Sequence, residues 1–357
     1  MSNKTKSEHQ SAQAQTKHLI FGAGLIGCYI GGALLHVKQN VSFVGRKRFL
    51  TQLEGQYTLS DFEGNRVTVS HDAALIDLAQ NTDLPQADVI WLTVKCTMLS
   101  EAISEMRPCV GDKTVIICCQ NGVNTHQEVE LAFPHNHVIR AMVPFNVVND
   151  DDKVFHRGSE GKMIIEIASA LESSTKWLSR QLSTPILPLG ISYHMTALQW
   201  AKLQLNMGNA VNALADVPVK QMLETRIYRR FIARLMRELL LVTEKQKIKL
   251  PKIANLPNTW IPKVLTLPDW LFKLLAQKMI AVDPKVKTSM WWDLSQNRQT
   301  EVDFIQGKVV SEAKRLDVPA PANEWTVSLI HRAEKGERMS AEQFKSALEQ
   351  FELEQDT

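Results

Sequence analysis

Residues 18–27, HLIFGAGLIG, decide the fold of this chain. The first four residues form a short apolar run, which is typical of a strand buried inside a sheet. Residues 25–37 have the length and apolar spacing of a helix, and a sharp glycine turn separates them from the strand. The turn and the first helical residues are Gly22, Ala23, Gly24, Leu25, Ile26 and Gly27. They match the pattern G-x-G-x-x-G in the setting that it requires, after a strand and at the start of a helix.

The glycines of this pattern have separate physical purposes. Gly22 allows a tight turn, and Gly24 lets the backbone approach a pyrophosphate without a side chain between them. Gly27 allows the helix to pack closely on the strand. The helix N-terminus adds unpaired N–H groups and the positive end of its dipole. The stretch therefore predicts a dinucleotide-binding site; the alternative is a glycine-rich turn that only packs.

The remaining pattern predicts two domains. Strands are expected over residues 41–44, 67–70, 88–94, 114–119 and 163–167, and helices over 73–80 and 98–106. This alternation indicates βαβ units and a parallel sheet. From about residue 192, long helical patterns replace the strands and cover 196–214, 225–245 and 300–316. The expected fold is α/β, with a Rossmann-type dinucleotide-binding domain over 18–190 and an all-helical substrate and catalytic domain over 191–357. Residues 1–17 are expected to be a disordered tail.

A stretch rich in proline and tryptophan, residues 250–284, interrupts the helical half. Within it, residues 269–280 have the spacing of an amphipathic helix. Its apolar side is expected to consist of Trp270, Leu271, Leu274, Leu275 and Met279. We expect this helix to pack on its own domain; a homodimer contact and a membrane contact are the alternatives.

Composition excludes several classes of protein. The 357 residues include 41 Lys and Arg and 38 Asp and Glu, and so small an excess (+3) argues against a dedicated nucleic-acid binder. The longest apolar run, 19–35, is shorter than the ~20 residues of a membrane span. None of the 5 cysteines lies in a C-x-x-C pair or near a spaced pair of histidines, so neither a disulfide framework nor a metal site is expected. With no secretory signal at its start, the chain is expected to be cytoplasmic, with reduced thiols.

The residues after the second expected strand bear on the choice of dinucleotide. Proteins that bind NAD usually place an acidic residue there to hold the ribose 2′-hydroxyl. Here the sequence reads Val44-Gly45-Arg46-Lys47-Arg48, without an acid. An arginine can pair with the 2′-phosphate of NADP in a bidentate manner. We therefore expect NADP(H), with Arg46 as its partner and Lys47 or Arg48 adding charge; a solvated basic turn is the alternative.

Several polar residues are candidates for the reaction site. Lys95 and the pair Asn121-Gly122 follow two buried strands, at the sheet edge where α/β proteins bind their ligands. In the helix 196–214, Lys202, Asn206 and Asn209 lie within about 60° of one another around the axis. Since burying an unpaired lysine is unfavourable, this stripe faces either a polar cavity or solvent. The first interpretation gives a cationic acid flanked by amides that orient an oxygen-rich substrate.

Several motifs of this chain follow one another in the order that is found in the ketopantoate reductase (2-dehydropantoate 2-reductase) family, which the chain resembles. They are GAGLIG, Arg46, Val94-Lys95, Gln120-Asn121-Gly122, Lys202-x-x-x-Asn206, Ser289-Met290 and Arg298-x-Thr300-Glu301-x-Asp303. The resemblance covers residues 18 to about 335. It implies a Rossmann domain followed by a helical domain, with the active site in the cleft between them. It also implies NADPH-dependent reduction of 2-dehydropantoate to (R)-pantoate, a step toward pantothenate and coenzyme A.

The resemblance also implies roles for single residues. Lys202 is the general acid, and Glu301 lies beside cofactor and substrate. Lys95 and Asn121 line the nicotinamide side, while Asn206 and Ser289 contact the substrate. The residues themselves, without the resemblance, add Asn209 to the expected substrate site. They also leave an alternative for Glu301, as an acid in the first turn of a helix that complements the helix dipole. An ammonium next to the ketone stabilises the charge that builds on its oxygen and can deliver the proton.

Two positions depart from the family pattern. The family places an asparagine eight residues after the lysine, where this chain has Ala210, and a further asparagine where an ungapped count reaches Lys220. These positions hold the substrate in the family. The departures keep two alternatives open: reduction of another branched 2-oxo acid, and an NADP(H)-binding regulator without turnover.

Overall fold

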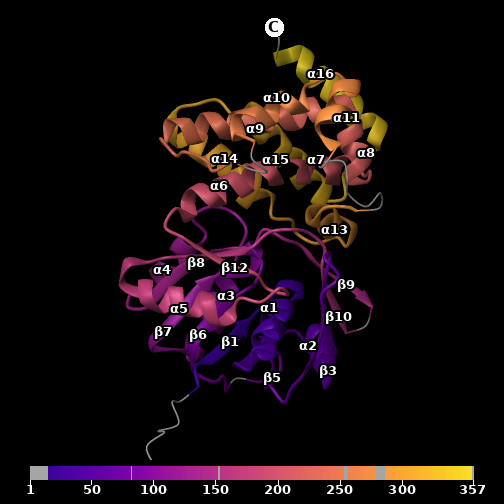
Figure 1. Cartoon of the computed structure of the whole chain (residues 1–357). Coiled ribbons are helices and arrows are strands. Elements are labelled where there is room, and N and C mark those ends of the chain that lie inside the picture. The colour runs from indigo at the N-terminus through magenta and orange to yellow at the C-terminus, as the bar shows by residue number, and fades with distance from the viewer. Residues whose placement is uncertain (1–14, 82, 152, 253–255, 278–285, 356–357) are drawn as a thin grey trace, which may run out of the picture. The chain divides into compact units, whose positions relative to one another are not determined.

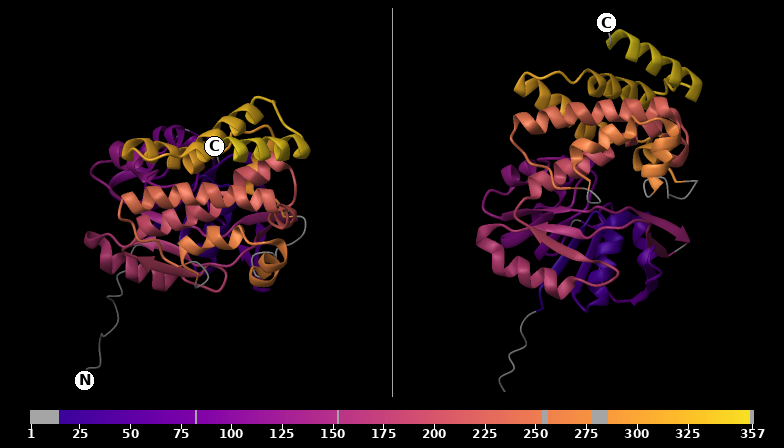
Figure 2. Two further views of the ribbon diagram at one scale, coloured as in Figure 1. Left: turned by 90° about the horizontal axis from the view of Figure 1, so that it is seen from above. Right: turned by 45° about the horizontal axis from the view of Figure 1, so that its top comes forward.

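The computed structural model describes residues 15–81, 83–151, 153–252, 256–277 and 286–355. The chain divides into two compact units, shown in Figures 1 and 2. The first unit comprises residues up to Val94, Leu99–Gln120 and His126–Tyr193. The second comprises Lys95–Met98, Asn121–Thr125 and His194–Thr357. Two short segments that follow sheet strands therefore belong with the helices of the second unit, and they bring candidate site residues there.

The main sheet of the first unit has eight strands in the order β12-β11-β8-β7-β6-β1-β2-β5. Their bounds are β12 Leu189–Ser192, β11 Met163–Glu166, β8 His137–Met142, β7 Val110–Cys118, β6 Ala87–Leu92, β1 Lys17–Phe21, β2 Asn40–Gly45 and β5 Leu75–Asp77. β1 lies between β2 and β6 and is parallel to both, with Phe21 opposite Val44 and Leu92. β11 is antiparallel to β8. The central strands thus form the parallel sheet that the sequence predicts.

The apolar run of β1 is continuous because both faces of the sheet are covered. Leu19 and Phe21 belong to one buried cluster and Ile20 to another, as expected from the alternation of side chains along a strand. The helices of this unit are α1 Leu25–His36, α2 Lys47–Leu53, α3 Leu99–Glu105, α4 His126–Ala132 and α5 Glu172–Leu182. Short 3₁₀ turns lie at Cys96–Met98, Arg107–Cys109 and Ser169–Leu171.

A second sheet of four strands was not predicted as a sheet. Its order is β4-β3-β10-β9, with bounds β4 Arg66–Ser70, β3 Gln56–Asp61, β10 Val154–Arg157 and β9 Val147–Asp151. β10 pairs in parallel with β3, across a large sequence separation. A buried ion pair between Arg157 and Asp61, 2.8 Å long, joins these two strands. Only β4 corresponds to an expected strand.

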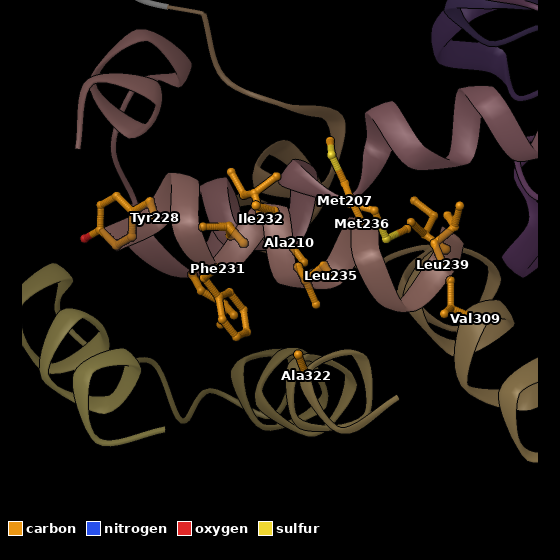
Figure 3. Close-up of a cluster of buried hydrophobic side chains, with 14 of the residues drawn as sticks. Met207, Ala210, Tyr228, Phe231, Ile232, Leu235, Met236, Leu239, Val309 and Ala322 are labelled. Carbon is orange, nitrogen blue, oxygen red and sulfur yellow. The ribbon is translucent and has the colours of Figure 1, made fainter. Parts of the chain in front are cut away.

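The second unit is built from helices around one apolar core, and Figure 3 shows part of this core. The helices are α6 Met195–Asn206, α7 Gly208–Ala215, α8 Val219–Glu224, α9 Arg226–Lys245, α10 Ile261–Leu265, α11 Asp269–Leu275, α13 Ser289–Ser295, α14 Val302–Leu316, α15 Pro321–Glu334 and α16 Ala341–Gln355. A 3₁₀ turn covers Asn258–Trp260. α9 supplies Phe231, Ile232, Leu235 and Leu239 to the core (Figure 3). None of the described helices is long and apolar enough to cross a membrane.

Three expectations about secondary structure were wrong. Residues 73–80 do not form a helix: Leu75–Asp77 is β5, because it pairs with β2 from Phe43 to Gly45, and pairing overrides local propensity. The helix expected over 196–214 is interrupted at Met207 and forms α6 and α7. The disordered tail was expected to include residue 17, but Lys17 already pairs with Asn40 in β1. Residues 1–14 lie outside the described residues.

A further correction concerns the face of α11. Phe272 and Ala276 are buried, whereas Trp270, Leu274 and Leu275 are 71%, 59% and 61% exposed. The apolar side expected from spacing therefore points largely to solvent. The buried side is instead the one that bears Phe272, which packs under the buried Arg229 guanidinium at 4.2 Å. Met279 and Ile280, also part of the expected helix, lie outside the described residues.

Candidate functional site

The glycine turn of the first unit has the geometry that its motif predicts. Gly22 has a φ of +96°, and its N–H donates to the carbonyl of Val44 at 3.0 Å. A Cβ at Gly27 would lie only 2.5 Å from the Gly22 carbonyl, so this position requires glycine. At Gly24, by contrast, a Cβ would meet nothing closer than 3.9 Å. The backbone at Gly24 is thus open to a ligand, whereas Gly22 and Gly27 are fixed by the fold.

The start of α1 next to this turn suits an anion. Gly24 is the N-cap residue, it provides no side-chain cap, and the first turn contains no acidic residue. The first N–H groups of a helix lack partners inside the helix. Of the three other motif residues, Ala23 is buried, and Leu25 and Ile26 are half-buried. The residues expected to hold a pyrophosphate therefore form one compact turn.

Arg46 lies beside the same turn. It follows β2 and is the N-cap residue of α2. The carbonyl of Val44, two residues before it, accepts hydrogen bonds from both Gly22 and Ala23. Arg46 is exposed, as are Lys47 and Arg48. The structure thus brings the predicted basic turn next to the predicted phosphate-binding turn.

In the second unit, Asn121 connects two charged residues. The Lys202 ammonium donates to Asn121 Oδ1 at 2.7 Å, and Asn121 Nδ2 donates to Glu301 Oε2 at 3.1 Å. An ammonium can only donate and a carboxylate can only accept, so only this orientation of the amide satisfies both. The three residues come from distant parts of the chain, yet they form one hydrogen-bonded chain.

Glu301 is fixed from its other side by the backbone. The N–H of Cys96 donates to Glu301 Oε1 at 3.0 Å, and the Cys96 thiol donates to the Asn121 carbonyl at 2.9 Å. The Glu301 residue is only 7% exposed. It occupies the N-cap position of α14 without capping that helix, so the alternative role as a first-turn acid is not what the structure shows. Burial, with the nearby Glu301 carboxylate, raises the pKa of the Cys96 thiol well above its ordinary value.

The turn that holds Asn121 is itself packed against α14. Gly122 has a φ of +92°, and a Cβ there would lie 3.1 Å from the carbonyl of Phe304. Only glycine combines this conformation with so close an approach. The Asn-Gly pair therefore lets the amide reach Glu301 on the adjoining helix start.

Lys95 is paired with a residue that sequence reasoning missed. Its ammonium lies 2.5 Å from Asp293 Oδ1 and 2.7 Å from Oδ2. The side chain of Asp293 is 7% exposed and that of Lys95 46%. Burial raises the pKa of the Asp293 carboxyl above its ordinary value, although Lys95 opposes this shift. Asp293 follows Ser289 by four residues, so helical spacing from Ser289 was a signal that could have found it.

The stripe on α6 and α7 is only partly as predicted. Lys202, Asn206 and Asn209 are all half-buried, while Leu205, next to Asn206, is exposed. Ala210 is fully buried, and Figure 3 shows it among core side chains such as Ile232 of α9. The departure from the family pattern at position 210 therefore lies in the core in this chain. The amide that remains half-buried in this turn is that of Asn209.

Asn212, at the edge of the predicted stripe, has a structural role. It is fully buried, and its Nδ2 donates to the Val217 carbonyl at 2.6 Å. Its Oδ1 accepts from both the backbone N–H and the hydroxyl of Thr288, each at 3.0 Å. Asn212 thereby fixes the start of α13, of which Thr288 is the N-cap.

The remaining predicted residues of this unit are more open. Ser289 is the first residue of α13 and is exposed, and Lys220 is the second residue of α8 and is half-buried. Across the residues that the structure describes, no three His, Cys, Asp or Glu side chains gather as metal ligands.

Two family models match this chain. The model "Ketopantoate reductase PanE/ApbA" matches residues 18–169, and "Ketopantoate reductase PanE/ApbA C terminal" matches residues 194–334. Together they cover well over half of the sequence. The chain belongs to the ketopantoate reductase family. It is accordingly an oxidoreductase.

Relatives within and around this family are similar over nearly the whole chain. The uncharacterized oxidoreductase YkpB of Bacillus subtilis is 25% identical over 325 residues, which span 89% of this chain and 100% of YkpB. A 2-dehydropantoate 2-reductase of Pyrococcus horikoshii is 23% identical over 321 residues, 89% of this chain and 97% of that protein.

Solved structures share the fold at similar identities. A PanE/ApbA family ketopantoate reductase from Ralstonia eutropha JMP134 aligns with a TM-score of 0.74 and 21% identity, over 90% of this chain and 99% of that one. D-mandelate dehydrogenase, solved with NADH and anilino(oxo)acetate, aligns with a TM-score of 0.72 and 20% identity, over the same shares of 90% and 99%.

The Lys95–Asp293 pair predicts a pH-dependent loss of stability. In Lys95→Met the buried carboxylate loses its partner, so the free energy of unfolding should fall by about 1–3 kcal/mol at pH 7. A carboxyl whose pKa is raised on folding destabilises the folded state as the pH rises past its ordinary value. The difference from wild type should therefore shrink as the pH falls, because protonation of Asp293 removes the charge that has lost its partner. Urea unfolding followed by circular dichroism at several pH values measures this.

The matched control is the double variant Lys95→Met/Asp293→Asn. This double variant carries no carboxylate at position 293. Its free energy of unfolding should therefore not fall further at neutral pH, where Lys95→Met has a buried carboxylate without a partner. A Lys95→Met variant whose destabilisation is the same at pH 4 and pH 7 would show that the pair contributes no electrostatic stabilisation.

Proposed function

We propose that this chain reduces the ketone of 2-dehydropantoate to an alcohol with NADPH as cofactor, and that Lys202 is the general acid. The observation that carries the proposal is the hydrogen-bonded chain from Lys202 through Asn121 to Glu301. Family membership supports the reaction, since relatives named 2-dehydropantoate 2-reductase match nearly the full length of this chain. The step would lie on the route to pantothenate and coenzyme A.

The first unit has residues that fit a dinucleotide. The open backbone at Gly24 and the uncapped start of α1 offer N–H groups to a pyrophosphate. Arg46 is exposed directly after β2, and β2 itself contains no acidic residue; a guanidinium at this position can pair with a 2′-phosphate. This combination favours NADPH over NADH. When bound, the cofactor supplies the hydride that the protein itself cannot provide.

Lys202 has the properties that a general acid for a ketone requires. Negative charge builds on the carbonyl oxygen during reduction, and a nearby ammonium both stabilises that charge and delivers a proton to the oxygen. The side-chain oxygen of Asn121, Oδ1, restricts where the Lys202 ammonium lies. Glu301 restrains the amide in turn. The amide thus stands between the Lys202 ammonium and the Glu301 carboxylate.

Three neutral polar residues of the second unit are suited to orienting a substrate. Asn206 lies on α6 with Lys202, Asn209 lies on α7, and both asparagines are half-buried; Ser289 is exposed at the start of α13. Amides and hydroxyls hold oxygen atoms without adding charge that would compete with Lys202. We assign these three residues to the substrate, and Lys95 with Asn121 to the nicotinamide side.

Another 2-oxo acid is the second candidate substrate. Lys220 stands where the family pattern has an asparagine, and Ala210 in the core supplies no amide to a substrate. D-mandelate dehydrogenase, which shares the fold, was solved with an oxo acid that carries an aromatic group. A regulator without turnover is disfavoured, because Lys202, Asn121 and Glu301 are retained and connected.

The general-acid role predicts the behaviour of Lys202→Ala. Turnover with the best 2-oxo acid should fall by at least ~10²-fold, since this is the usual contribution of a general acid. Binding of NADPH, measured by fluorescence titration, should stay within a few-fold of wild type. The exposed Lys335→Ala variant is the control for loss of a lysine elsewhere in this unit. Near-wild-type turnover of Lys202→Ala would refute the assignment.

The 2′-phosphate role predicts a cofactor-selective effect of Arg46→Ala. Affinity for NADPH should fall roughly 10-fold or more, as expected from loss of a charge-assisted pair, while affinity for NADH changes little. Calorimetric titration of both cofactors measures the two effects. Arg66→Ala removes another exposed arginine of the same unit and should leave both affinities unchanged. Equal weakening of NADPH and NADH by Arg46→Ala would contradict the role.

A further inference from the structure

α11 presents an apolar surface to solvent. Trp270, Leu274 and Leu275 are 71%, 59% and 61% exposed. Scattered exposed apolar residues are common, but three large ones on a seven-residue helix form a patch of the kind that binds partners. We call these three side chains the apolar patch.

The patch is held firmly on α9. The fully buried Arg229 lies over the Phe272 ring at 4.2 Å and donates to Asp269 Oδ1 at 2.6 Å. Its Nε also donates to the Leu265 carbonyl at 3.1 Å, at the end of α10. These contacts fix the side of α11 that faces α9, and they leave the apolar patch on the outside.

A row of arginines lies on α9, the helix against which α11 packs. Arg226, Arg230, Arg234 and Arg237 fall within about 80° around the helix axis, and we call them the arginine row. The guanidinium of Arg229, with Arg226 near it, holds the pKa of Asp269 at the start of α11 below its ordinary value. Of the row, Arg226 therefore lies near the start of α11.

Three members of the row line a pocket. Arg230, Arg234 and Arg237 form its walls together with Thr266, which ends α10, and Glu352 of α16. Glu352 pairs with Arg230 at 3.1 Å. Within the described residues, the Arg237 guanidinium makes no hydrogen bond or ion pair. One carboxylate against three guanidinium groups leaves the pocket cationic.

We propose that the apolar patch and the arginine row together bind the surface of an anionic phospholipid bilayer. Guanidinium groups bind phosphate oxygens in a bidentate geometry, which suits the pocket to a headgroup phosphate. Tryptophan prefers the interfacial layer of a bilayer, and leucines of an interfacial helix enter the acyl boundary. The attachment is peripheral and does not depend on the proposed reductase activity.

Charge decides between a bilayer and a second copy of the chain. A two-fold dimer would place the same surface of both copies against each other. The arginine row would then face itself, and like charges across an interface are unfavourable. An anionic bilayer supplies the opposite charge and an apolar layer at once, so it complements both parts of the surface.

Binding of the full-length protein to lipid vesicles tests the proposal. Vesicles of phosphatidylcholine are compared with vesicles that also contain 30% phosphatidylglycerol, by co-sedimentation at about 0.1 M and 0.5 M NaCl. The protein should sediment with the anionic vesicles at low salt and much less with neutral ones. High salt should reduce the binding, because exposed charges are screened.

Variants locate the binding on this surface. Trp270→Ser/Leu274→Ser and, separately, Arg237→Gln should each lower the partition coefficient for anionic vesicles by about tenfold or more. All three side chains are exposed, so the fold should be retained, which circular dichroism and the melting temperature check. Trp177→Ser on α5, where the tryptophan is 54% exposed, is the matched control and should bind like wild type.

Three outcomes would overturn the proposal. The first is equal binding to neutral and anionic vesicles, or binding to neither. The second is a dimer in sedimentation velocity that Trp270→Ser/Leu274→Ser dissociates, since a second copy would then cover the patch. The third is competition by millimolar inorganic phosphate together with no effect of the apolar variant, which would indicate a soluble phosphate ligand.

Discussion

The carboxamide of Asn121 joins the cation and the anion on which the candidate site depends. Its oxygen accepts from Lys202 at 2.7 Å and its nitrogen donates to Glu301 at 3.1 Å. Because an amide has one accepting and one donating end, it can connect an ammonium to a carboxylate without letting them neutralise each other directly. The glycine after Asn121 lets the turn approach α14, and the Cys96 backbone holds the far oxygen of Glu301. A small change in any of these parts would move the ammonium.

Local sequence was sufficient for the central parallel strands and for the glycine turn. The apolar strand and the spacing of Gly22, Gly24 and Gly27 encode their structure within about ten residues, and the structure follows them. The second sheet could not be predicted in this way, because β3 and β10 pair across nearly a hundred residues. β5 was missed for the same reason, since three residues acquire strand geometry only from their neighbour β2. The buried side of α11 bears Phe272 against Arg229, a contact that spacing within one helix cannot reveal.

For the site, chemistry and spacing identified the residues but not all of their partners. Lys202, Asn121 and Glu301 are each recognisable as candidates, and the structure adds that one amide connects them. Asp293 was missed, because a carboxylate becomes notable only when it is buried against Lys95. From the sequence, Ala210 was interpreted as a change in the substrate site. In the structure the helix is interrupted at Met207, and Ala210 on α7 is buried in the core. Such corrections require tertiary packing, which a single sequence does not contain.

The reaction proposed for this site is the reduction of a 2-oxo acid, with 2-dehydropantoate as the substrate. The most direct measurement is the steady-state loss of NADPH absorbance with 2-dehydropantoate beside 2-oxoisovalerate, pyruvate and phenylglyoxylate. We predict a kcat/KM of about 10⁴ M⁻¹s⁻¹ or more for 2-dehydropantoate, with the other acids far slower. A poor rate with 2-dehydropantoate beside a fast rate with another acid would contradict the substrate while leaving the catalytic lysine in place. No oxidation of NADPH by any of the four acids would contradict the reductase itself.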